Sequence, residues 1–187
     1  DATYEQLNAA LGFKTSPVTG LWFNIYGGYQ DLKNNLASAA IANYSGSYLQ
    51  LLQGNMHNIY AGAEASYSYK DIISFTASGV YRDWKTAKTE NNSGDQLLYY
   101  MPSFEANFKV DIRPISSVLI NLGYQHITRE KIGNERVDPV GNLYLGGSYE
   151  VFEGISIYVR ANNLLNKDYQ YYWGYPTEGI NFMGGVS

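Results

Sequence analysis

The stretch Phe104-Glu105-Ala106-Asn107-Phe108-Lys109-Val110-Asp111-Ile112 alternates apolar and polar residues without a break. Side chains of a β-strand point to opposite faces with a period of two residues. This strand therefore has one apolar face, and its other face carries Glu105, Lys109, Asp111 and an amide. Such a strand separates two different surroundings.

The same alternation continues through the segments 118–128, 141–151 and 155–162. In each of them the apolar face carries no Lys, Arg, Asp or Glu in the core of the strand. A series of such strands, rich in Tyr and Gly, is typical of a transmembrane β-barrel. In this all-β fold class the apolar face meets lipid and the polar face meets a wet lumen.

We expect an antiparallel meander of about nine strands, joined by alternating short and long links. Residues 31–55 are expected to form a long loop, part of which could extend the flanking strands. The expected strands run at about Tyr4–Lys14, Leu21–Gln30, His57–Lys70, Ile73–Lys85, Leu98–Ile112, Val118–Thr128, Gly141–Val151, Ile155–Asn162 and Ile180–Val186.

Tight links force neighbouring strands to pair antiparallel. Each pair must also keep its faces aligned, because a slip of one residue would move charges to the apolar face. Around the turn Phe152-Glu153-Gly154, this requirement places Gly146 opposite Arg160, Ser148 opposite Tyr158 and Glu150 opposite Ser156.

The alternation of short and long links predicts an orientation in the bacterial outer membrane, with short turns at the periplasmic end and long loops outside. Single-chain barrels of this membrane have even strand numbers. An odd number of strands, with the first running inward, predicts that residues 1–187 form a single segment from the C-terminal part of a larger barrel domain.

The composition agrees with a barrel. Of 187 residues 19 are Tyr and 3 are Trp, which prefer the boundary between lipid and water. No run approaches 18 apolar residues, which excludes a helical membrane protein. With no Cys and a net charge of −4, the chain has no disulfide framework, no Cys-based zinc site and no nucleic-acid footprint.

We find no pattern of catalytic, metal or cofactor residues, and we expect no enzyme. His57 and His126 are far apart in sequence, without Cys neighbours, and a Gly-x-Ser-x-Gly motif is absent. An acid pair of an outer-membrane phospholipase or protease is conceivable, but a mixed-sign ladder inside a lumen explains the charges more simply. The lumen-facing charged residues are predicted to be Glu64, Arg82, Glu105, Lys109, Asp111, Glu150 and Arg160.

The segment 163–179 is expected to be a long aromatic loop. Its rings could stack on a small ligand such as a sugar or a chelate, or they could form an interface girdle. The candidate ligand-binding residues are Tyr169, Tyr171, Tyr172, Trp173 and Tyr175.

The run Asn163-Leu164-Leu165-Asn166-Lys167-Asp168-Tyr169 resembles an N-L-x-N/D-K-x-Y motif near the end of TonB-dependent outer-membrane receptors. The stretch from Phe182 to Ser187 resembles the closing strand of that family, without its usual terminal aromatic residue, so we expect a truncated end. The amino-acid sequence of the 163–176 stretch resembles that of receptors of Bacteroidota. The resemblance covers about 30 residues, and the remainder agrees in strand rhythm only.

The resemblance implies a barrel of about 22 strands filled by an N-terminal plug. It further implies energised uptake, through TonB, of a scarce nutrient such as an iron chelate, cobalamin or glycan. The partners would be outer-membrane lipid, TonB and the nutrient ligand. Neither plug nor TonB-binding segment is found in these residues, so we expect that they do not transport alone.

Two other classes remain open from the sequence: a small complete barrel that acts as an adhesin, and a soluble β-sandwich that binds a partner. A sandwich would bury the apolar face against a second sheet. A need for detergent during purification would discriminate between these classes.

Overall fold

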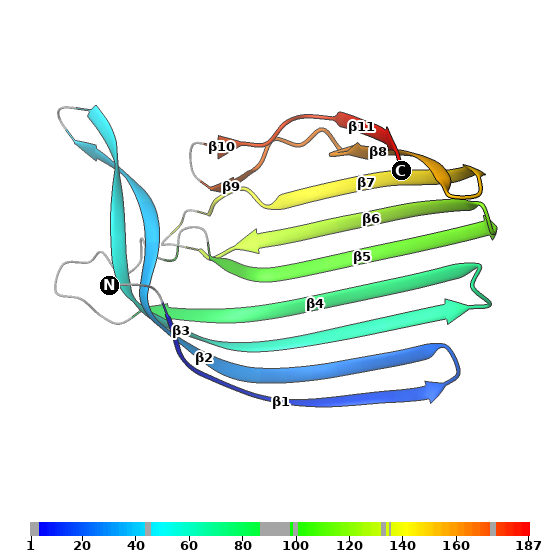
Figure 1. Ribbon diagram of the computed structural model, residues 1–187. Coiled ribbons are helices and arrows are strands. Elements are labelled where there is room, and N and C mark those ends of the chain that lie inside the picture. The colour runs from blue at the N-terminus through cyan, green and yellow to red at the C-terminus, as the bar shows by residue number, and fades with distance from the viewer. Residues whose placement is uncertain are drawn as a thin grey trace.

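The computed structural model describes residues 4–43, 46–86, 98, 101–131, 134, 136–172 and 175–187, which form one large antiparallel sheet and one small hairpin (Figure 1). The sheet consists of β1 (Tyr4–Val18), β2 (Leu21–Asn43), β3 (Gly46–Tyr69), β4 (Ile73–Thr86), β5 (Pro102–Ile115), β6 (Val118–Arg129), β7 (Val140–Phe152), β8 (Ile155–Asn162) and β11 (Asn181–Val186). The hairpin consists of β9 (Gln170–Tyr172) and β10 (Tyr175–Pro176).

The large sheet is a meander in which all nine strands follow the chain order. This confirms the predicted fold class. The turns after β1, β3, β5 and β7 lie together at the right-hand end of Figure 1, and we call the opposite end of the large sheet, where β6 ends and β7 begins, the rim. Backbone conformations with positive φ shape three of the tight turns, at Gly20 (φ 84°), Lys70 and Asp71 (φ 47° and 55°), and Gly154 (φ 84°).

In the observed register, residues of the apolar face pair with apolar-face residues of the next strand, so each face is continuous across the sheet. One continuous row runs through Phe13, Ile25, Ala63, Gly79 and Ala106 on β1 to β5. The register of β7 and β8 is the predicted one: Gly146 pairs with Arg160, Ser148 with Tyr158 and Glu150 with Ser156.

The apolar face is left uncovered. Leu11 is 86% exposed, and Phe182 and Ile59 are exposed to a similar degree. Soluble proteins rarely expose apolar surface of this extent, because contact with water costs about 25 cal/mol per Å². The described residues therefore present this face to a non-aqueous surrounding or to a partner.

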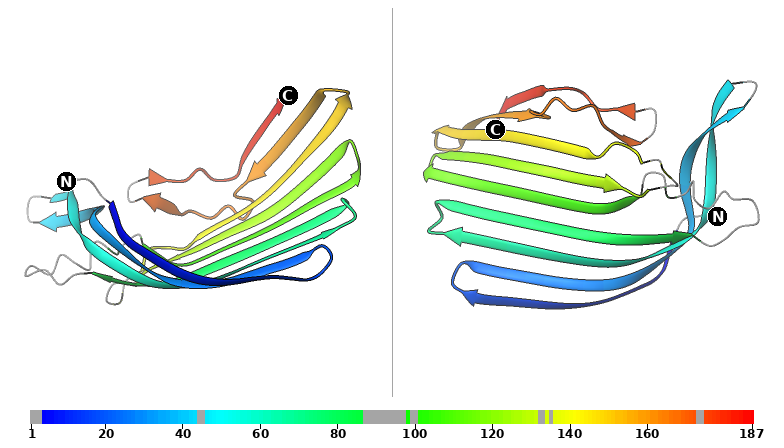
Figure 2. Two further views of the ribbon diagram at one scale, coloured as in Figure 1. Left: turned by 60° about the horizontal axis from the view of Figure 1, so that its bottom comes forward. Right: turned by 180° about the vertical axis from the view of Figure 1, so that it is seen from behind.

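The polar face lies on the inside of the curved sheet. Figure 2 shows the β9–β10 hairpin on the concave side. Tyr169, at the base of this hairpin, packs with Ile127 and Val140, and the Tyr171 hydroxyl bonds to Gln125. Because Ile127, Gln125 and Val140 occupy the register of the polar face, the polar face is the concave one.

The largest difference from the sequence prediction is in residues 31–55. The expected loop is instead an extension of β2 and β3, paired from Asn35–Gly54 to Asn43–Gly46 beyond a bulge at 32–35. The bulge includes Asn34 in a left-handed conformation (φ 53°), whose backbone N–H donates to Asn55 Oδ1 at 3.1 Å. Small, non-alternating residues gave no periodic signal for this pairing.

Three strand ends also differ by three or four residues. β1 continues through Pro17 to Val18 and β5 continues through Pro114 to Ile115, and each Pro lies in a register shift of its strand pair, where its missing N–H costs no ladder bond. β5 begins at Pro102 and not at Leu98, which lies in a separate tight turn closed by a bond from Met101 N–H to Leu98 O.

In the part of the sheet that the structure describes, charged residues appear on the convex face only near the rim. Lys33 pairs with Asp31 and Lys85 pairs with Asp83, both at 3.2 Å. His57 lies in register between Asp31 and Lys85. The apolar band therefore ends about where the sequence-predicted strand cores end, and the extended strands continue into a polar surrounding.

Candidate functional site

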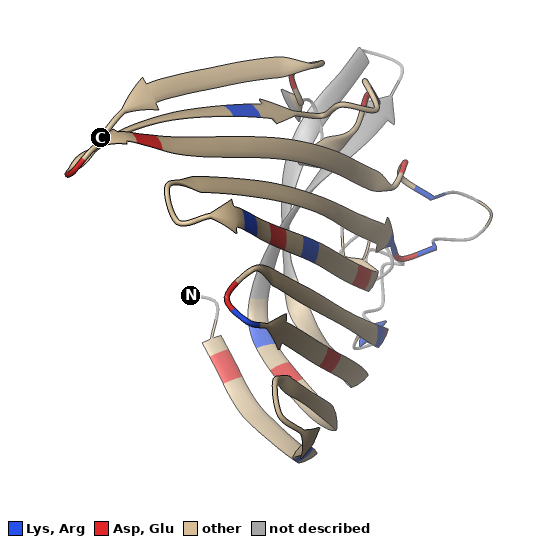
Figure 3. Cartoon of the chain, turned by 90° about the vertical axis from the view of Figure 1, so that its right-hand side faces the viewer, with Lys and Arg blue, Asp and Glu red and all other residues tan. Residues whose placement is uncertain are grey.

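The concave face near the rim carries two groups of side chains that could contact a solute: a polar shelf on β2 to β6 and the β9–β10 hairpin. The charged residues predicted to face the lumen lie on this concave face of the sheet. Figure 3 shows how densely charges alternate along β5, compared with the other strands.

The concave charges are arranged mainly in local contacts. Arg82 Nη1 and Glu105 Oε2 form an ion pair between β4 and β5, and Lys109 pairs with Asp111 at 3.1 Å. Glu64 accepts a bond from Asn24, at 3.4 Å, and Arg160 donates to Asn162 Oδ1 at 2.8 Å. These pairs are partly exposed to water, so each contributes at most about 1 kcal/mol to stability.

Glu150 lies apart from this group. Its carboxylate accepts a bond from the Gly154 N–H at 3.3 Å, in the exposed turn between β7 and β8. The seven predicted charges are thus held in separate local contacts along the concave face.

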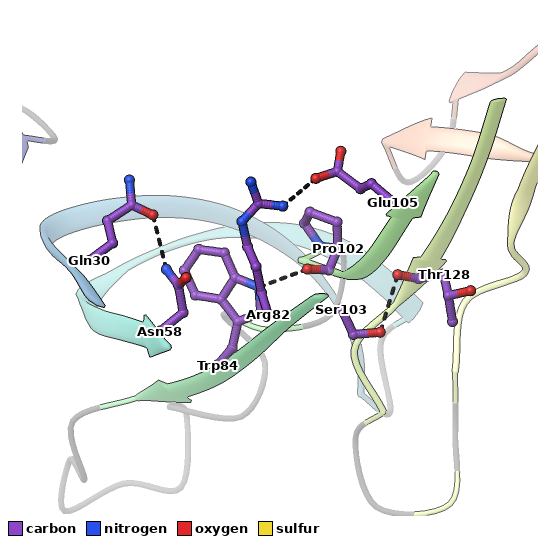
Figure 4. Close-up of polar contacts among 8 residues, drawn as sticks. All are labelled: Gln30, Asn58, Arg82, Trp84, Pro102, Ser103, Glu105 and Thr128. Atoms are coloured by element: carbon purple, nitrogen blue, oxygen red, sulfur yellow. Dashed lines mark hydrogen bonds and ion pairs between the residues drawn. The ribbon is translucent and has the colours of Figure 1, made fainter. Parts of the chain in front are cut away.

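The shelf is built around Trp84 and Asn58 (Figure 4). Trp84 Nε1 donates to Pro102 O at 2.9 Å, and its ring packs with Met56 and Leu98. Asn58 is completely buried and donates to Gln30 Oε1 at 2.9 Å. A small apolar cluster of Trp84, Met56 and Leu98 thus lies on the polar face of the sheet at the rim.

A carboxylate fixes the direction of the amides in the shelf. Gln30 donates through Nε2 to Glu5 Oε2 at 2.6 Å, and a carboxylate can only accept. The Gln30 oxygen must therefore face Asn58, which in turn must direct its NH₂ group to Gln30. These hydrogen bonds connect β1, β2 and β3 side by side, at the same level of the sheet.

The β9–β10 hairpin covers the concave side of β6 and β7. Tyr169 is 5% exposed and contacts Tyr171 edge-on, with ring centres 5.7 Å apart. Burial raises the pKa of the Tyr169 phenol, and the neighbouring Tyr171 adds to the rise. Tyr169 is therefore a neutral, packed side chain at the pH of any aqueous compartment of a cell.

The predicted aromatic residues occupy different positions. Tyr169 is buried and Tyr171 is partly exposed. Tyr172 and Tyr175 pair across the hairpin through their backbones. Trp173 lies outside the described residues. Of the predicted aromatic residues, the structure thus brings Tyr169 and Tyr171 together, on the concave side near the rim.

The Asn163–Tyr169 motif forms a clamp at the base of this loop. Asn163 is 2% exposed, has φ 50°, and donates through Nδ2 to Lys167 O and Glu178 O, both at 3.0 Å. Its Oδ1 accepts from the Lys167 N–H at 3.1 Å. Asn166, also at positive φ, accepts a bond from the Ile180 N–H at 3.3 Å. The two asparagines hold both ends of the loop together.

Tyrosines lie flat along the concave wall over glycines of neighbouring strands. Tyr26 on β2 is paired with Gly62 on β3, and a Cβ on Gly62 would overlap the Tyr26 ring. Tyr144 on β7 covers Gly123 on β6 in the same way, and the Arg160 guanidinium lies 4.2 Å from the Tyr144 ring centre. The rings thus occupy the space that a side chain at each glycine would take.

Sequence reasoning missed Asn58, Trp84, Gln125, Ile127 and Arg129. Ile127 and Trp84 carried a usable signal, because each is a bulky apolar residue at a polar-face position near a strand end. Such a residue indicates that a loop covers that position. The amides carried no comparable signal.

Among the described residues, no group of three or more His, Cys, Asp or Glu side chains could hold a metal ion. His57 and His126 both lie on the convex face, and His126 bonds to Thr128 Oγ1 at 2.9 Å. In the same part of the chain, no helix has the length and apolar character needed to cross a membrane.

The meander, its uncovered convex face and its polar concave face define the class: the fold is that of a segment of an outer-membrane β-barrel. No protein-family model and no curated protein matches the sequence. Solved structures do match, at 13–17% identity, so the likeness concerns the fold.

The similar structures include the copper transporter OprC (17% identity, TM-score 0.69), covering 96% of this chain and 30% of OprC. The ferric-catecholate import receptor Fiu of E. coli K12 has 13% identity and a TM-score of 0.68, with 96% and 26% coverage. OmpT of Vibrio cholerae has 15% identity and a TM-score of 0.59, with 96% and 54% coverage. The chain spans about a third or less of the two receptor-type neighbours.

Proposed function

We propose that these residues form the C-terminal part of the barrel of an outer-membrane receptor, which takes up a scarce nutrient with energy delivered through TonB. The observation that carries the proposal is the sheet with two opposite faces. Its convex face exposes large apolar side chains, and its concave face carries ion pairs and amides. Only a wall between lipid and a wet lumen suits both faces.

Two further observations support a receptor over a general pore. Several structurally similar proteins are described as a metal transporter or as receptors for ferric chelates. The Asn163–Tyr169 motif resembles that of TonB-dependent receptors, and in the structure its asparagines hold a loop at the rim. A plug and a TonB-binding segment would then belong to other parts of the receptor, and a Bacteroidota-like source remains a prediction.

The two alternative classes fit less well. A β-sandwich would cover the apolar face with a second sheet, whereas the described residues form one large sheet and a short hairpin on the opposite face. A small closed barrel would pair its first and last strands, whereas β1 and β11 are at opposite ends of the strand order.

The intact receptor should take up at least one nutrient probe only while the inner membrane is energised. The experiment gives cells that express the intact protein a ferric catecholate, cobalamin or an oligosaccharide, with and without a protonophore. We expect binding of the accepted probe to persist and its uptake to stop when the proton gradient collapses. Uptake that continues after collapse would show a passive pore, and recovery of the protein in the soluble fraction would overturn the membrane assignment.

Replacing Tyr172 and Trp173 together by Ala should weaken uptake of the accepted probe and leave barrel assembly intact. Stacking of an aromatic ring on a ligand is worth about 0.5–1.5 kcal/mol beyond area burial, so two rings account for up to roughly a hundredfold in affinity. Assembly is checked by heat-modifiable mobility of the barrel in gels. Failure of assembly would instead place these rings in the membrane girdle, and unchanged uptake would make them structural.

A further inference from the structure

The β9–β10 hairpin is attached to the concave wall by an apolar anchor. Tyr169 fills a cluster with Ile127 on β6 and Val140 on β7, and Val140 is completely buried. A short two-stranded hairpin is at best marginally stable on its own in water. Its inward position therefore depends on this packing against the wall.

Polar bonds attach the same hairpin to β6. Arg129 is buried, and its Nη2 donates to Gln170 O at 3.1 Å. The Tyr171 hydroxyl donates to Gln125 Oε1, also at 3.1 Å. Swinging the hairpin away from the wall would break both bonds and expose Tyr169 to water.

The two legs of the hairpin are also joined to each other. Thr177 donates to Tyr169 O through its N–H at 3.0 Å and through its Oγ1 at 2.9 Å. Below them, Asn163 connects Lys167 to Glu178. The loop is thus closed at its base and anchored along its length, which is the arrangement of a fixed element and not of a hinged one.

We propose that the described residues of the β9–β10 hairpin, 169–172 and 175–177, form a stationary constriction at the mouth of the lumen, and that Tyr171 is the side chain that selects solutes there by size. The proposal rests on the proposed function, because it assumes that solutes pass this mouth. Tyr171 is suited to the role because the residue is 37% exposed while its hydroxyl is held by Gln125.

A cross-linking experiment tests whether the hairpin is stationary. These residues contain no Cys, so the pair Gln125→Cys and Tyr171→Cys in the intact receptor can be joined in native membranes by a short bifunctional thiol reagent. Each single variant controls for labelling, and Tyr171→Cys with Ser148→Cys is the matched distant pair. We expect joining of the first pair only, and uptake of the accepted probe by the joined double variant should stay within about twofold of uptake by the same double variant before joining.

A labelling experiment tests the selection by size and needs no transported ligand. Asn107 is exposed on β5 and lies directly opposite Gln125, so Asn107→Cys reports access next to the hairpin. Tyr171→Ala should raise its labelling by a bulky maleimide from outside by about tenfold, equivalent to removing ~1.4 kcal/mol of steric barrier. Labelling by a small maleimide should not change, and neither should labelling in Tyr171→Phe, which keeps the ring and loses only the bond to Gln125.

The possible outcomes separate the two proposals. Loss of uptake on cross-linking, or no cross-link although both single Cys variants are labelled, would overturn the stationary constriction. Equal bulky-reagent labelling in Tyr171→Ala and in the unsubstituted receptor would overturn selection by Tyr171. If the unsubstituted receptor takes up no probe, the proposed function fails, while cross-linking and labelling still decide where the hairpin lies.

Discussion

An Ala63→Arg substitution in the intact receptor is expected to destabilise the folded barrel by about 2–4 kcal/mol. Ala63 lies on the convex face in the middle of the 57–70 part of β3, which forms the apolar band, and in the row that joins Ile25 and Gly79. An arginine at this depth would place a guanidinium in hydrocarbon, where water cannot solvate it. The measurement is the free energy of unfolding in phospholipid vesicles, from a urea titration.

Two matched variants on β3 separate the effect of the sheet face from the effect of depth in the membrane. Ser66→Arg lies on the concave face and is expected to be tolerated, because its side chain reaches water. Ile59→Arg lies on the convex face beside Asp83, where the apolar band ends, and should cost less than Ala63→Arg. Equal stability of Ala63→Arg and Ser66→Arg would refute the assignment of the faces.

An Asn163→Ala substitution is expected to destabilise the loop from 164 to 179 by about 2–4 kcal/mol. The change removes three hydrogen bonds and leaves the Lys167 N–H and two carbonyls without their partner, at a cost of about 1–3 kcal/mol for each group that stays buried. It also places Ala at φ 50°, which is unfavourable for a residue with a Cβ. Hydrogen exchange of the loop amides in the intact protein measures the effect.

Asn163→Gly is the control for backbone strain, because it loses the same bonds but accepts positive φ; it should lie about 1 kcal/mol closer to the unsubstituted protein. Asn166→Ala is the control for position. Asn166 has a similar φ of 47° but is exposed. Unchanged protection of the loop in Asn163→Ala would mean that the clamp contributes nothing, and the inward course of the loop would need another cause.

The faces and the register of the sheet were predictable because both follow from short-range rules. The alternation from Phe104 to Ile112 assigns each side chain to a face, and a tight turn such as 152–154 leaves one register that keeps the faces aligned. The extension of β2 and β3 beyond Asn34 follows from no such rule. Its residues on the β2 side are mostly small, those on the β3 side include a run of Leu and Gln, and neither side alternates, so the pairing is a continuation of the hairpin below it.

The site was less predictable because its contacts depend on where loops fold. The sequence marks Tyr169 and Tyr171 as aromatic, but only the packing of Tyr169 on Ile127 and Val140 turns the loop inward. The positions of Ile127 and Trp84 on the polar face could have indicated that something covers them. The bond from Arg129 to Gln170 O joins residues 41 positions apart, and no local pattern indicates it.

The tyrosines that lie over glycines determine how far the side chains of the concave face project from the sheet. Each ring can lie over the residue opposite only because that residue has no side chain, as for Tyr26 with Gly62 and Tyr144 with Gly123. A Cβ at either glycine would tilt the ring toward the axis and narrow the bore, although the glycine itself never touches what passes. The width of such a channel would therefore depend on glycines of the neighbouring strands as well as on the side chains that line it.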